Sequence, residues 1–212
     1  MGSYGVIART SETLLELLRE RIRERPDAID VDRHMIALAS PDDVDDDSNI
    51  RLSLHLYEVT SNDVLNTTTR EYVDEETMRD PPLALDLKYL LTAYPTNSND
   101  NVTPAAIDQQ RLLGLAIQTL NDNSVIDGTE LGGSEFDRKV SINLQPDSSS
   151  NVPEIWRSLQ ESTLRPSIVY EVTPVLIDSL AEEEVPRVEE RGMEFEDKDE
   201  EGARQESRAP DT

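Results

Sequence analysis

The stretch LALDLKYLLTAY, residues 83–94, decides the fold class because its large apolar residues recur at every second position. A period of two is typical of a β-strand with one face buried against a core. The opposite face begins with Ala84, Asp86 and Lys88 but ends with Leu90 and Tyr94. We therefore expect a strand whose far end is covered on both faces.

Similar patterns on either side of this strand predict the rest of the fold. Strands are expected over residues 34–38, 50–57, 138–144 and 167–178, and helices over 3–25, 103–121 and from 151 to Pro166. Residues 60–82 are polar and predict a hairpin or flap that leaves the core. Pro174 favours an edge position for the last strand, because proline cannot donate to a second neighbour. This order predicts an α/β (α+β) fold in which helices pack on a single mixed sheet.

The charge of the chain is extreme, at -25 over 212 residues. Residues 181–212 hold 13 acidic and 5 basic side chains and few large apolar ones, which predicts a disordered acidic tail after a folded domain at 1–180. The folded part is acidic as well and contains few lysines, so we hypothesise a halophilic source. Such a surface would repel nucleic acids and anionic membranes, and neither is expected as a partner.

Several classes of site and of location are disfavoured by what the sequence lacks. It contains no cysteine, which excludes disulfides and thiolate chemistry. It shows neither a signal-peptide pattern nor a long apolar run, so we expect a protein that is made in the cytoplasm.

No motif in the sequence predicts an enzyme. His34 and His55 are the only histidines, and each lies in a predicted strand without a catalytic pattern around it. Asp43, Asp45, Asp47 and Asn49 have the alternate spacing of a calcium loop, but the loop lacks the required glycine and the final glutamate. We therefore predict no catalytic residues, no cofactor and no metal.

Several segments together resemble the cap, or tail-terminator, proteins of extracellular contractile injection systems, the particles known as Photorhabdus virulence cassettes and antifeeding prophages. The matching segments are SYGVIA at 3–8, RLSLHLYEVT at 51–60, PLALDLKYLLTAY at 82–94, QQRLLG at 109–114, VSINL at 140–144, IW at 155–156 and RPSIVYEV at 165–172. They occur in order over residues 1–180. The acidic surface and the charged tail depart from the resemblance.

The resemblance implies a structural subunit that ends a tube as a ring, expected to be a hexamer, and contacts the last sheath ring. Its partners would then be itself, the tube and the sheath, within a particle that leaves the cell. Candidate interface residues are Gln110, Arg111, Trp156, Tyr170, Val172 and Val175. For Trp156, packing in the core is the favoured interpretation and an interface anchor is the alternative. Two other functions stay open: an acidic adaptor or nucleic-acid mimic that binds basic partners, and a metal hydrolase based on residues 42–47.

Overall fold

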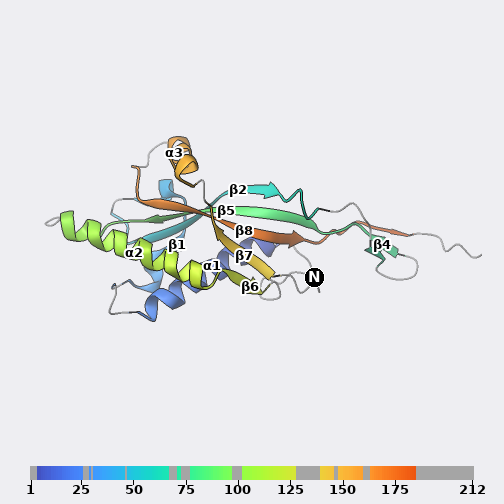
Figure 1. Ribbon diagram of the computed structural model, residues 1–212, viewed down its shortest axis with the longest axis horizontal. Coiled ribbons are helices and arrows are strands. Elements are labelled where there is room, and N and C mark those ends of the chain that lie inside the picture. The colour runs from blue at the N-terminus through green and yellow to red at the C-terminus, as the bar shows by residue number, and fades with distance from the viewer. Residues whose placement is uncertain are drawn as a thin grey trace, which may run out of the picture.

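A computed structural model describes residues 4–25, 29, 31–45, 47–66, 71–72, 77–96, 102–127, 139–145, 148–159 and 163–184. Its body is a six-stranded mixed sheet that carries helices on both faces (Figure 1). A second, three-stranded sheet lies beyond one end of the body. The predicted fold class is thus confirmed, with a small sheet that the sequence patterns did not separate.

The strand order of the large sheet is β1-β2-β5-β8-β7-β6. The strands are β1 (Ile36–Leu38), β2 (Leu52–Ser61), β5 (Leu83–Ala93), β6 (Val125–Asp127), β7 (Lys139–Leu144) and β8 (Ser167–Ile177). β1 is parallel to β2, and the other neighbours are antiparallel. The quoted stretch therefore forms a central strand, which explains why the side chains at its far end are buried on both faces.

Two long helices, α1 (Val6–Arg23) and α2 (Val102–Asp122), cover one face of the large sheet, as their shared core cluster shows. α1 presents Leu14, Leu18 and Ile22 to this core, the spacing expected of one helix stripe. The opposite face is covered by α3 (Ser148–Ser158), whose Trp156 packs with Leu90 and Val169. The two apolar layers together bury both faces of the central strands around Leu90 and Val169.

Polar contacts fix how the helices sit on the sheet. Ser11 on α1 shares a hydrogen bond of 2.8 Å with the hydroxyl of Tyr89 on β5. The side-chain amide of Gln109 on α2 donates to the carbonyl of Ala93 at 2.6 Å, and the guanidinium of Arg19 donates to the carbonyl of Ile36. Each bond satisfies a polar group that packing removes from water, so these contacts specify the register between helix and sheet.

The predicted flap forms the small sheet with strand order β3-β4-β9. β3 (Glu71–Tyr72) and β4 (Thr77–Arg79) are antiparallel, and β9 (Glu182–Glu184) pairs with β4 from the other side. Residues 182–184 thus form a strand although the sequence predicted a disordered tail from residue 181. The rest of the tail lies outside the described residues, and the division into a domain and a tail stays a prediction.

Other differences from the predicted elements are small. β6 was not predicted, because three residues are too few to show a period. α3 begins at Ser148, three residues before the predicted cap, so Pro153 lies inside the helix. Residues 34–35 belong to a short 3-10 helix, η1 (Arg33–Met35), and another, η2 (Pro41–Asp43), opens the acidic loop.

Burial of tyrosines predicts a loss of stability in alkali. Burial raises the pKa of Tyr89 and of Tyr170 to about 12, and burial together with the charges of Glu58 and Glu171 does the same for Tyr57. An unfolded tyrosine ionises near pH 10, so the free energy of unfolding should fall as the pH rises from about 10 to about 12. Each tyrosine contributes at most about 1.4 kcal/mol per pH unit.

Urea unfolding between pH 8 and pH 11.5 measures this slope. Tyr89→Phe should make it shallower, whereas Tyr4→Phe, at an exposed tyrosine, should leave it unchanged. A stability that stays level from pH 9 to pH 11.5 would contradict the assignment.

Candidate assembly surfaces

The six candidate interface residues fall into two groups. Gln110 and Arg111 lie on the exposed side of α2, and Arg111 pairs with Asp108 of the same helix at 3.4 Å. The other four side chains are buried within the chain: Trp156, Tyr170, Val172 and Val175. The structure therefore places Trp156 in the core. An interface role for Gln110 and Arg111 stays a prediction.

The expectation that the strand at 167–178 is a sheet edge is wrong. β8 lies between β5 and β7, and Val172 is paired with Leu87 on one side and Ile142 on the other. Pro174 is compatible with this inner position because β7 pairs with β8 only as far as Thr173. A proline at Val172 would therefore remove backbone hydrogen bonding inside the sheet and disrupt the fold.

Among the described strands, one available edge of the large sheet is the outer flank of β2. β1 pairs only with Leu52 to Leu54, so among the described strands none lies beside residues 55–61 on that side. Val59 in this stretch is exposed despite its apolar side chain. An unpaired strand flank offers backbone groups for the addition of another strand.

A row of polar side chains follows this half of the sheet on the α3 side. Lys88 pairs with Glu58 at 3.1 Å, and the amide of Asn62 donates to Asp86 at 2.8 Å. The hydroxyl of Thr173 also donates to Asp86. Burial, with the charge of Asp86, raises the pKa of Glu171 in spite of Lys88. The sequence alternation placed Asp86 and Lys88 on one face of the strand, and the structure shows both of them paired across the sheet surface.

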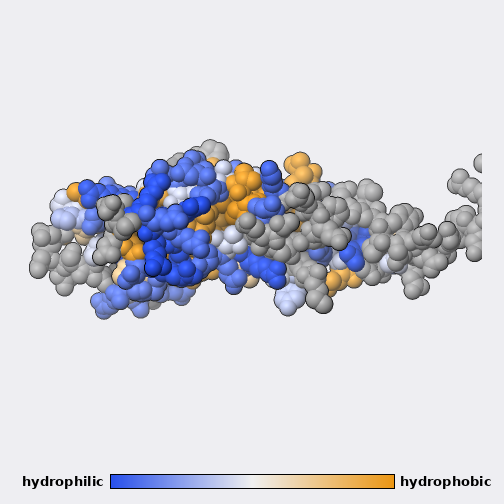
Figure 2. All heavy atoms as spheres, turned by 90° about the horizontal axis from the view of Figure 1, so that it is seen from below, coloured by the Kyte–Doolittle hydropathy of each residue, from blue (hydrophilic) through white to orange (hydrophobic). Residues whose placement is uncertain are grey.

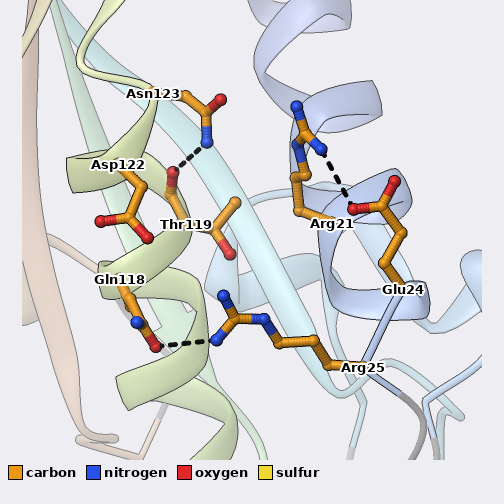
Figure 3. Close-up of a pocket in the computed structure, with 7 residues that line it drawn as sticks. All are labelled: Arg21, Glu24, Arg25, Gln118, Thr119, Asp122 and Asn123. Carbon is orange, nitrogen blue, oxygen red and sulfur yellow. Dashed lines mark hydrogen bonds and ion pairs between the residues drawn. The ribbon is translucent and has the colours of Figure 1, made fainter.

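A polar pocket of about 230 Å³ lies between the ends of α1 and α2 (Figure 3). The guanidinium of Arg25 reaches across to the side-chain oxygen of Gln118 at 3.2 Å, and Arg21 pairs with Glu24 at 3.1 Å. The remaining lining residues are Thr119, Asp122 and Asn123. Sequence reasoning missed this pocket, because its two walls are 93 positions apart in the chain.

His55 lies within range of the charges of Asp42 and Asp43 in the acidic loop. Burial lowers the pKa of His55, while Asp43 and Asp42 act in the opposite direction. Within the described ranges, which omit Asp46, no three acidic or histidine side chains are placed to hold a metal ion. No helix in the described part is both long and apolar enough to cross a membrane.

The fold has relatives among solved structures. The sheath and tube terminator of an extracellular contractile injection system of the PVC type, in its extended state, matches with a TM-score of 0.57 and 15% identity, over 93% of this chain and 64% of that one. The tube-terminating cap of the anti-feeding prophage matches with a TM-score of 0.50 and 19% identity, over 83% of this chain and 59% of that one. This chain thus spans less than two thirds of either relative. A search of curated proteins gave no match.

The sequence itself matches a family model, described as the Pvc16 N-terminal domain, over residues 9–190. The match covers α1 from Arg9 onward, α2, α3, and every strand of the two sheets. The chain therefore belongs to the Pvc16 N-terminal domain family.

Proposed function

We propose that this protein is a structural cap that ends the tube of a phage-tail-like contractile injection particle. The observation that carries the proposal is that the terminator and cap structures share its fold over 93% and 83% of the chain. The first of these relatives is a sheath and tube terminator, and the second is a tube-terminating cap. A cap acts through shape and contacts, and it requires no catalytic residues.

The cap works as a closed ring, for which we propose six copies. Rings form when two different surfaces of each subunit are complementary and the rotation between copies closes. A further surface must contact the tube. For the sheath, the candidate surface is the flank of β2 at residues 55–61, to which a sheath strand can be added. An acidic adaptor would explain the charge of the chain but not the fold that it shares with two terminators.

Tube length tests the proposal. Particles assembled without this chain are expected to contain tubes of broadly varying length, because nothing stops the addition of tube rings. Restoring the chain should return one narrow length distribution by electron microscopy. Equal length distributions with and without the chain would contradict a capping function.

A further inference from the structure

Charge is distributed unevenly over the molecule. We define the helix layer as residues 6–25 and 102–122, which form α1 with its last turn and α2. This layer holds six basic and six acidic side chains, so its formal charge is zero, whereas the whole chain carries -25. The acidic excess therefore lies entirely outside the helix layer. Figure 2 shows that this face is still hydrophilic over much of the left half, where both helices lie in Figure 1.

The outward side of α2 carries an uncharged stripe. Its residues recur every three or four positions and are all exposed: Thr103, Ile107, Gln110, Gly114, Gln118 and Asn121. At 1.5 Å per residue the stripe is about 27 Å long. Charged residues make up 31% of the chain, yet the stripe itself holds none; the exposed Arg111 borders it and pairs with Asp108 of the same helix.

Gly114 lies in the middle of this stripe. A glycine inside a helix costs stability relative to alanine, because it loses more backbone freedom on folding. Nothing lies within 4 Å of the position that a β-carbon would take at Gly114. Packing within the chain therefore does not require the glycine, whereas a body that approaches α2 closely from outside would.

We propose that the uncharged stripe of α2 binds a second copy of this chain. Two bodies of charge -25 repel each other over most of their surfaces, and the helix layer is where an acidic copy can approach without that repulsion. The pocket at the end of the stripe holds two arginines, Arg21 and Arg25, and two carboxylates, Glu24 and Asp122, so it adds no net charge that would repel an acidic copy. The contact joins the stripe to a different, acidic surface, as a ring requires. This inference rests on the proposed ring.

Adding charge to the stripe tests the contact. Gln110→Glu with Gln118→Glu introduces two negative charges, and the second can still bond Arg25 within the chain, so folding should persist. We expect self-association, measured by sedimentation from micromolar to millimolar concentration in dilute and in molar KCl, to weaken at least about tenfold. Arg157→Glu on α3 makes the same change in net charge on the opposite face of the sheet and should associate as the wild type does.

A unique thiol identifies the occupant of the stripe. The chain has no cysteine, so Gly114→Cys provides one labelling site. Its alkylation should slow as the protein concentration rises. Slow alkylation at every concentration, relieved by removing residues 185–212, would instead mean that the chain's own acidic tail covers the stripe, and would overturn the proposal.

The remaining outcomes separate this contact from the capping function. If the wild type forms rings and the double glutamate variant forms them equally well, the stripe is not the contact, although the ring stands. A wild-type chain that stays monomeric in every condition overturns the contact with a second copy, while capping is judged independently by tube length.

Discussion

Replacing Trp156 with alanine should lower the free energy of unfolding by about 3 to 5 kcal/mol, the usual cost of truncating a buried aromatic residue. Trp156 on α3 packs against Leu90 and Val169, so its loss removes the main apolar anchor of α3 on the sheet. The α1/α2 side should keep its packing, because its core cluster does not include these residues. Urea unfolding followed by circular dichroism measures the effect, since the variant lacks the only tryptophan.

Trp156→Phe is the matched control. Phenylalanine keeps most of the buried ring and removes the indole N–H, which is buried without a hydrogen-bond partner among the described residues. Burying an unpaired donor is unfavourable, so its removal offsets part of the lost packing. The phenylalanine variant should therefore be much closer to the wild type than to the alanine variant. Equal losses for the two would show that α3 is not anchored by the ring.

Salt should stabilise the folded chain strongly. The chain carries a net charge of -25, and all of this excess lies outside the helix layer. In the folded state these negative charges repel one another. In molar KCl the screening length falls from about 10 Å at 0.1 M to about 3 Å, so the melting temperature should rise. For a chain of this size each kcal/mol of relieved repulsion is worth about 2 to 4 °C.

Scanning calorimetry in dilute buffer and in molar KCl measures this shift. Repeating it with a chain that ends at Glu184 tests whether the folded part itself is responsible, because that chain lacks most of the acidic tail. A melting temperature that does not change with salt would remove the halophile hypothesis and the role given to charge.

The parts of the fold that sequence could predict are those with a clear local period. The alternation over residues 83–94 identified the central strand, and the stripe of Leu14, Leu18 and Ile22 identified the buried side of α1. β6 escaped because three residues carry no period. The position of β8 was predicted wrongly, because a proline lacks a backbone N–H donor only at its own residue. Pro174 lies just past Thr173, the last residue of β8 that pairs with β7.

The candidate surfaces were harder to predict, because each depends on contacts between distant segments. The free flank of β2 exists because β1 stops at Leu38, and the pocket joins Arg25 to Gln118, which lie 93 positions apart in the chain. Composition alone gave the total charge. Only the folded arrangement showed that α1 and α2 together form a neutral layer on an acidic molecule.

The most direct test of the account is the location of the protein in an assembled particle. Arg157→Cys places a single thiol at an exposed position of α3, and a gold label on it can be seen by electron microscopy. The account predicts label at one end of each tube and nowhere along its length. Label spread along the sheath, or particles that carry none, would contradict it.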